Sequence, residues 1–177
     1  MKKTFVTLPQ LQTIMAQYPT PFHLYDEEGI RQNARALKAA FAWNPGYKEY
    51  FAVKATPTPG ILQVLKEEGC GLDCSSLTEL MLAQRCGVTG HDIMFSANNV
   101  PSEEFQLAHE LGAILNLDDF TDIDFLQETI GAIPETISCR YNPGGTFTLG
   151  ASNEGFQVMD NPGQAKYGMT RPQLTEA

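Results

Sequence analysis

The sequence predicts an α/β protein with the architecture of a (β/α) barrel, and three observations support this prediction. Five short apolar runs of strand type alternate with amphipathic segments of helical periodicity. Equivalent apolar residues of the five runs are separated by 21, 21, 21 and 23 residues, in the order Phe51, Leu72, Ile93, Ile114 and Ile137. The runs are almost continuously apolar, which is typical of parallel strands buried on both faces. A strand–helix unit repeated at this interval implies parallel strands joined by right-handed crossovers.

Two other architectures fit this repeat less well. A leucine-rich solenoid repeats at about 20–29 residues, but its LxxLxLxxN pattern is missing. A doubly wound sheet stays open as an alternative, although no GxGxxG turn follows the first strand. A complete barrel has eight units in about 250 residues, whereas this sequence supplies five strands before TRPQLTEA, which resembles the start of a new helix. We therefore expect about five of the eight units, in a truncated chain.

The expected elements follow in order along the chain. Residues 1–26 are an N-terminal segment that ends in a leading strand, PFHLYD at 21–26, and residues 27–177 are the N-terminal portion of the barrel. A helix is expected from Glu27 to about Trp43, before the sequence NPG stops it. A helix is also expected after each of the first four strands, and the strands lie in YFAVKA, GLDCSS, DIMFSA, AILNLD and TISCRYN.

Two sequences signal the starts of helices. SLTE at 76–79 is a capping box with Ser76 as the N-cap and Glu79 as the third helical residue, and TDID at 121–124 repeats the pattern with an aspartate. Glu79 is therefore either a cap or a catalytic carboxylate, and the sequence leaves both roles open.

Charge and composition indicate a cytoplasmic protein. The net charge of −9 argues against a nucleic-acid or anionic-membrane partner. No apolar run approaches the roughly 20 residues of a membrane helix, and MKKTFVTLPQ lacks the apolar core of a secretory signal. The four cysteines form no CxxC pair and the three histidines are scattered, so we expect reduced thiols and no metal site.

Polar residues are predicted at the carboxyl ends of the strands, where the functional groups of (β/α) barrels gather. Lys54 follows the first strand and Asp73 ends the second, and the later strand ends carry Ser96, Asn98, Asn99, Asn116, Asp118, Arg140 and Asn142. Partial desolvation there would favour a neutral Lys54 amine, which forms Schiff bases with aldehydes such as pyridoxal 5'-phosphate (PLP). The alternative is a structural lysine, with its stem buried and its ammonium group solvated or paired with Asp73.

Six stretches occur in the order and spacing found in bacterial diaminopimelate decarboxylases, which the chain resembles from about residue 20 onward. They are TPFHLYDEEGI, YFAVKATP, GLDCSSLTEL, FSANN, RYNPGG and AKYGM. These enzymes are fold-type III PLP-dependent decarboxylases. The resemblance implies a (β/α)8 barrel, a C-terminal β-domain that is absent from this chain, and a homodimer with active sites at the subunit interface.

The resemblance also implies roles for individual residues. Lys54 matches the lysine that holds PLP as a Schiff base, Ala52 and Asp73 match positions that line the cofactor pocket, and Arg140 matches an arginine close to the cofactor. The glycines of NPGGTFTLGASNEG at 142–155 suggest a phosphate cradle, but this stretch matches a mobile loop near the active site. The histidine that stacks on PLP, the phosphate-binding glycines and the acidic partner of the pyridine nitrogen are expected beyond residue 177.

The activity implied by the resemblance is the decarboxylation of meso-2,6-diaminopimelate to L-lysine and CO2, the last step of lysine biosynthesis, in the full-length protein. Three alternatives stay open. They are the decarboxylation of another basic amino acid or of carboxynorspermidine, a non-catalytic PLP-binding barrel, and a fragment without activity of its own.

Overall fold

A five-stranded parallel sheet forms the centre of the computed structural model, which describes residues 4–142 and 167–177. Each strand pairs with the next one along the chain, so the order in the sheet is β1-β2-β3-β4-β5. This order confirms the predicted parallel sheet of repeated strand–helix units. The strands are β1 (Tyr50–Ala52), β2 (Gly71–Cys74), β3 (Ile93–Ser96), β4 (Ile114–Leu117) and β5 (Ile137–Cys139).

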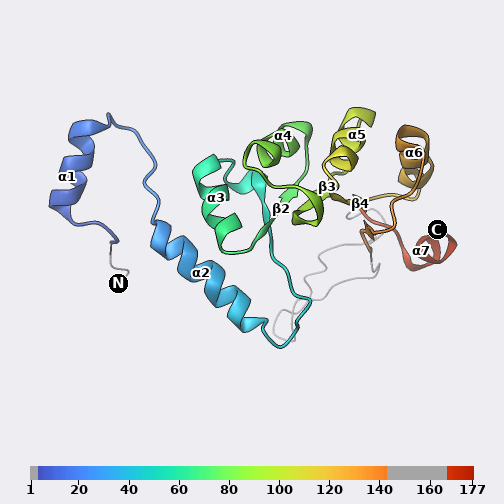
Figure 1. Ribbon diagram of the computed structural model, residues 1–177, viewed down its shortest axis with the longest axis horizontal. Coiled ribbons are helices and arrows are strands. Elements are labelled where there is room, and N and C mark those ends of the chain that lie inside the picture. Colours follow the sequence, from blue (N-terminus) through green and yellow to red (C-terminus); the bar gives the residue numbers. More distant parts are fainter. Residues whose placement is uncertain (1–3, 143–166) are drawn as a thin grey trace, which may run out of the picture.

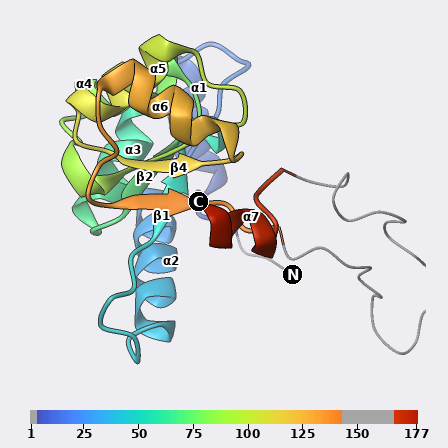
Figure 2. The ribbon, with the colours of Figure 1, turned by 90° about the vertical axis from the view of Figure 1, so that its right-hand side faces the viewer.

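Four helices follow the first four strands and cover one face of the sheet in sequence order (Figures 1 and 2). They are α3 (Pro59–Glu67), α4 (Leu77–Arg85), α5 (Ser102–Glu110) and α6 (Thr121–Ile130). Short 3-10 turns at Val53–Ala55 (η1) and Gly90–Asp92 (η2) complete the connections. Helices on one face of a parallel, sequentially ordered sheet make a partial (β/α) barrel, as the repeat predicted.

The hydrophobic core lies between the sheet and this helical layer. Leu72, Ile93 and Phe95 on the strands are fully buried against helical side chains such as Leu80 and Phe105. Burying each large apolar side chain contributes roughly 1.5–3 kcal/mol. Because side chains alternate along a strand, the residues between these core positions point to the opposite face of the sheet.

Cap geometry confirms one predicted helix start and corrects the other. Ser76 is the N-cap of α4, but the Glu79 carboxylate accepts a hydrogen bond from the Ser75 N–H at 2.9 Å, one residue earlier than in a capping box. TDID is not a capping box, because Thr121 is already the first residue of α6. The Asp119 carboxylate, which lies before the TDID motif, accepts a hydrogen bond from the Thr121 N–H at 2.9 Å. It thus provides a partner for a backbone N–H of the first helical turn.

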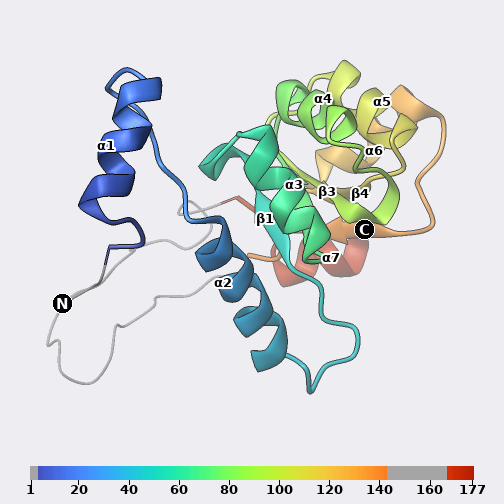
Figure 3. The ribbon, with the colours of Figure 1, turned by 60° about the vertical axis from the view of Figure 1, so that its left-hand side comes forward.

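The N-terminal segment differs from the prediction. The strand predicted at 21–26 is wrong: these residues join no strand in the described part of the chain, and Asp26 instead caps α2 (Glu27–Ala40) by accepting from the Gly29 N–H at 3.1 Å. An extended segment without a ladder partner does not become a strand. An unpredicted helix, α1 (Leu8–Gln17), buries none of its residues and stands apart from the sheet (Figures 1 and 3).

The remaining expectations concern the cysteines and the C-terminal part. All four cysteines are free, and Cys70, Cys74 and Cys86 are buried as small core residues. The helix expected at TRPQLTEA forms as α7 (Arg171–Glu176). The loop predicted at 142–155 lies outside the described residues, except for Asn142. In the described ranges, none of the helices combines the length and the apolar character needed to cross a membrane.

Candidate active site

The face of the sheet turned away from the helices carries polar side chains near the carboxyl ends of the strands. Asp73 lies between Ala52 and Met94 in the ladder, and Ser96 is aligned with Asn116, which is aligned with Ser138. The Ser138 hydroxyl donates to the Asn116 amide oxygen at 2.8 Å, across β4 and β5. These positions alternate with the buried core residues, so the binary pattern of the strands builds a polar inner face.

Lys54 lies in the turn η1, directly after β1, where Val53 is fully buried and fixes the turn to the core. The Lys54 side chain is exposed, not partly desolvated as the sequence suggested. Among the described residues β1 is an edge strand, so none of the described strands covers Lys54 from the other side. Within the described residues Lys54 makes no ion pair, so the predicted structural pair with Asp73 is not formed.

Ala52 and Asp73 sit side by side in the β1–β2 ladder, below Lys54. Burial raises the pKa of the Asp73 carboxyl, while a hydrogen bond from Ser96 and the positive charge of Lys54 act in the opposite direction. Asp73 Oδ1 is buried and has no hydrogen-bond partner among the described residues. The small side chain of Ala52 leaves room beside this carboxyl group.

Arg140 follows β5 and reaches toward the ends of β3 and β4. Its Nη1 lies 2.8 Å from Asp118 Oδ1 and donates a hydrogen bond to Asn98 Oδ1 at 2.9 Å. Asp118 is only 3% exposed, and this burial raises the pKa of its carboxyl against the opposing effect of Arg140. The sequence placed all three residues at strand ends, but it carried no signal that Asp118 and Asn98 would converge on Arg140.

Glu79 lies close to Asp73, but its carboxylate is hydrogen-bonded to the backbone. Its carboxylate accepts from the Ser75 N–H, and its negative charge adds to the burial effect that raises the pKa of Asp73. Of the two roles left open by the sequence, the geometry supports the cap.

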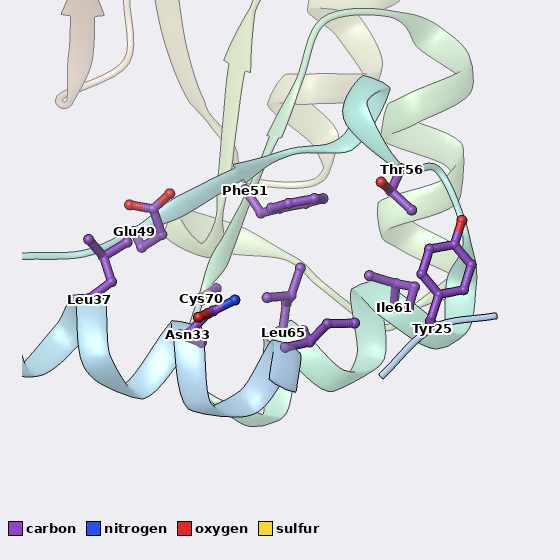
Figure 4. A pocket seen from close by; sticks show the side chains of 11 residues that line it. Tyr25, Asn33, Leu37, Glu49, Phe51, Thr56, Ile61, Leu65 and Cys70 are labelled. Carbon is purple, nitrogen blue, oxygen red and sulfur yellow. The ribbon is translucent and has the colours of Figure 1, made fainter. Parts of the chain in front are cut away.

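A separate cavity of about 360 Å³ lies between α2, α3 and β1 (Figure 4). Its lining is mainly apolar and includes Leu37, Phe51, Ile61 and Leu65, with Glu49 at one side. None of the four predicted site residues lines it. The polar chemistry of the chain is therefore at the strand ends and not in this cavity.

The strand-end groups fit a small anionic ligand with a reactive carbonyl group. An unpaired lysine amine can attack an aldehyde, and the Arg140 guanidinium can bind an anion or a phenolic oxygen. The Asp73 oxygen without a hydrogen-bond partner among the described residues can accept a hydrogen bond from a ligand. This donor set is compatible with PLP.

Comparison with known proteins agrees with this chemistry. Residues 27–172 match the family model described as pyridoxal-dependent decarboxylase, pyridoxal binding domain. Protein TabA of Pseudomonas amygdali pv. tabaci is 41% identical over 169 residues, which cover 96% of this chain and 38% of TabA. Diaminopimelate decarboxylase of Methanothermobacter thermautotrophicus is 34% identical over 130 residues, which cover 72% of this chain and 30% of that protein. TabA is thus more similar to this chain than that decarboxylase is.

A solved structure shares the fold as well as the sequence. The crystal structure of Helicobacter pylori diaminopimelate decarboxylase complexed with L-lysine superposes with a TM-score of 0.61 at 29% identity, covering 67% of this chain and 30% of that one. The chain therefore spans only 30–38% of the length of these three proteins. The family model nevertheless matches most of the chain, which therefore belongs to the pyridoxal-dependent decarboxylase family and matches its pyridoxal-binding domain.

Proposed function

We propose that this chain is the cofactor-anchoring part of a PLP-dependent amino-acid decarboxylase, with Lys54 as the residue that holds the cofactor. The observation that carries the proposal is the position of Lys54: its amine follows a barrel strand and has no ion-pair partner among the described residues, and Asp73 lies beside it. An amine in this position is available to an aldehyde, and the paired form of the structural alternative is absent from the described residues.

The other site residues support this role without forming covalent bonds. PLP, when bound, takes up the electron pair that is left when the bond between Cα and the carboxylate breaks. Asp73 provides a negative charge next to the Lys54 amine, and Arg140 provides hydrogen-bond donors at the opposite side of the strand ends. Ala52 lies beside Asp73 on the edge strand β1. The groups that stack on the ring and bind the phosphate are expected elsewhere in a longer chain.

For the substrate we propose meso-2,6-diaminopimelate, which the full-length protein would convert to L-lysine and CO2. The similarity to proteins named diaminopimelate decarboxylase supports this choice, as does the L-lysine in the related crystal structure. The higher identity to TabA, whose name states no reaction, favours a related amino acid as the second candidate. We further propose that the full-length protein is a homodimer.

Borohydride reduction tests the anchoring residue. The protein is expressed with its complete reading frame, loaded with PLP and reduced, and the labelled peptide is identified by mass spectrometry. We expect the label on Lys54 and its loss in Lys54→Arg. Lys48→Arg is the matched control, because Lys48 pairs with Asp92 at the opposite, amino-terminal side of the sheet. Label on a different lysine in the unmodified protein would disprove the assignment.

Measurement of CO2 release tests the substrate. Diaminopimelate, ornithine, lysine and carboxynorspermidine are compared at equal concentrations, and we expect the highest kcat/KM for diaminopimelate. A higher kcat/KM for another compound would show that diaminopimelate is the wrong substrate and would identify that compound instead. Bound PLP without turnover of any of them would contradict the proposed substrate, and absence of CO2 release from a wider panel of amino acids would indicate a non-catalytic barrel.

A further inference from the structure

The Arg140 side chain is held by groups from two other strand ends. Within the described residues, both polar contacts of its guanidinium involve the same nitrogen: Nη1 faces Asp118 Oδ1 at 2.8 Å and donates to Asn98 Oδ1 at 2.9 Å. Asn98 follows β3, Asp118 follows β4 and Arg140 follows β5, so three successive units contribute one residue each. These contacts fix the Arg140 side chain relative to the ends of β3 and β4 and not only to its own strand.

Burial distinguishes Asp118 from an ordinary surface partner. Its side chain is 4% exposed, compared with 27% for Arg140 and with the exposed side chain of Asn98. A buried carboxylate costs free energy unless a cation or hydrogen-bond donors compensate it. Arg140 is the cation that faces Asp118 at 2.8 Å, and because Asp118 Oδ1 has no hydrogen-bond partner among the described residues, this ion pair is the contact that offsets its burial.

Residues 168 and 169, in the last described segment, also contact Arg140. The Met169 N–H donates to the Arg140 carbonyl at 2.7 Å, and a Cβ on Gly168 would come within 3.0 Å of Arg140 Cγ. Gly168 has a φ of 113°, which favours glycine, so the chain can pass this close to Arg140. The backbone and the stem of Arg140 are therefore confined as well as its guanidinium.

The geometry of these contacts leaves part of the guanidinium free. Arg has five N–H donors in a planar fork, and within the described residues only Nη1 of Arg140 donates to the protein. The donors on Nε and Nη2 can serve a ligand in an orientation set by the contacts at Nη1.

We propose that Asp118 is a positioning residue, which orients Arg140 for contact with the cofactor and is assisted in this by Asn98. The inference rests on the proposed function, since it requires that PLP binds at these strand ends. Asp118 itself does not touch the cofactor in this proposal, and its effect on PLP is transmitted entirely through Arg140.

A double-mutant cycle on PLP affinity tests the inference in the full-length protein. Asp118→Asn keeps the shape of the side chain and removes its charge. We expect it to weaken PLP binding about tenfold, and we expect no additional loss when it is combined with Arg140→Gln, because coupled residues are not additive. Asp118→Glu is expected to restore part of the affinity. The matched control is Asp124→Asn, an exposed residue of α6 with the same change in charge.

A second measurement needs no cofactor. In the PLP-free protein, modification of Arg140 by a 1,2-dicarbonyl reagent is followed by peptide mapping, and we expect faster modification in Asp118→Asn than in the unmodified protein. Thermal unfolding checks that each variant is folded. If Asp118→Asn does not fold, Asn98→Ala replaces it, with an expected loss of about threefold in PLP affinity that again disappears in the Arg140→Gln background.

The outcomes separate this inference from the proposed function. Unchanged PLP affinity in Asp118→Asn, or losses that add to that of Arg140→Gln, would overturn the positioning role while leaving Lys54 as the anchor. Absence of PLP binding by the unmodified protein would overturn both proposals.

Discussion

Asp73 combines burial with an incomplete set of partners. Its Oδ1 has no hydrogen-bond donor among the described residues, and burial raises the pKa of its carboxyl. A buried, unsatisfied oxygen costs free energy in the folded state, and such groups persist where a ligand uses them. The position of Asp73 in the ladder beside Ala52, next to Lys54, places this cost at the proposed cofactor site.

Replacing Asp73 by asparagine is expected to stabilise the protein and weaken PLP binding. Removing the buried negative charge should raise the free energy of unfolding by about 1 kcal/mol at neutral pH. When folding raises the pKa of a carboxyl group, the folded protein loses stability as the pH rises from the unfolded pKa to the folded pKa of that group. The advantage of the variant should therefore shrink as the pH falls toward the usual aspartate range. Chemical denaturation at several pH values measures it, and an advantage that grows toward acid pH would contradict this account.

At the scale of the elements, a group of ion pairs joins α2 to α3. Arg31 lies 2.6 Å from Glu67 and 3.1 Å from Glu68, and Arg35 lies 2.6 Å from Glu68. No residue of α2 is fully buried, although apolar residues of both helices line the cavity of Figure 4. Hydrogen bonds from Arg35 and Arg31 lower the pKa of the Glu68 carboxyl to about 2.

The pKa of Glu68 predicts how α2 responds to acid. A carboxyl group with a lowered folded pKa contributes stability above its unfolded pKa, and this contribution is lost as the pH falls through the folded value. The contact between α2 and α3 should thus weaken from about pH 4.5 down to about pH 2. Glu68→Gln should remove the two ion pairs of Glu68 at neutral pH, weaken the contact between α2 and α3, and speed hydrogen exchange in α2. Glu110→Gln on the exposed side of α5 is the control. Equal hydrogen exchange of α2 in both variants would show that the ion pairs of Glu68 do not hold α2 against α3.

At the scale of the whole molecule, the sheet is open. β1 forms one edge, and beyond β5 the described chain adds only a single bridge between Tyr141 and Met169. The mainly apolar cavity of Figure 4 lies beside β1, at the same edge. An unpaired strand edge next to exposed apolar surface is a site for pairing with another chain.

Residues 1–177 produced alone are therefore expected to self-associate. Parallel edge strands without partners should pair with a second copy, so the apparent mass in sedimentation experiments should rise with protein concentration. The full-length protein is the comparison, and it should form a discrete species. A monomeric 177-residue chain with a single cooperative unfolding transition would contradict this expectation.

Much of the fold could be predicted, since it depends on local patterns, whereas the role of Lys54 as the anchor stays a prediction. The 21-residue interval and the apolar runs were sufficient for the parallel sheet, and Lys54 stands within a short ordered motif. The strand predicted at 21–26 was wrong because its composition suits an extended chain, while strand formation depends on a partner distant in sequence. The TDID start was wrong because a neighbouring aspartate outside the motif satisfied the backbone.

The sequence by itself determined the order of the five strands and of the helices that follow the first four, and the placement of Lys54, Asp73 and Arg140 near strand ends. Periodicity and apolar burial act through near neighbours, and the sequence displays them directly. Only the tertiary structure decided that Lys54 is exposed and unpaired among the described residues, that Asp73 retains an orphaned oxygen, and that Asp118 and Asn98 meet at Arg140. These properties depend on distances between residues of different strand–helix units, 42 positions apart for Asn98 and Arg140. Such distances are set when parallel strands align in register and not by any local pattern.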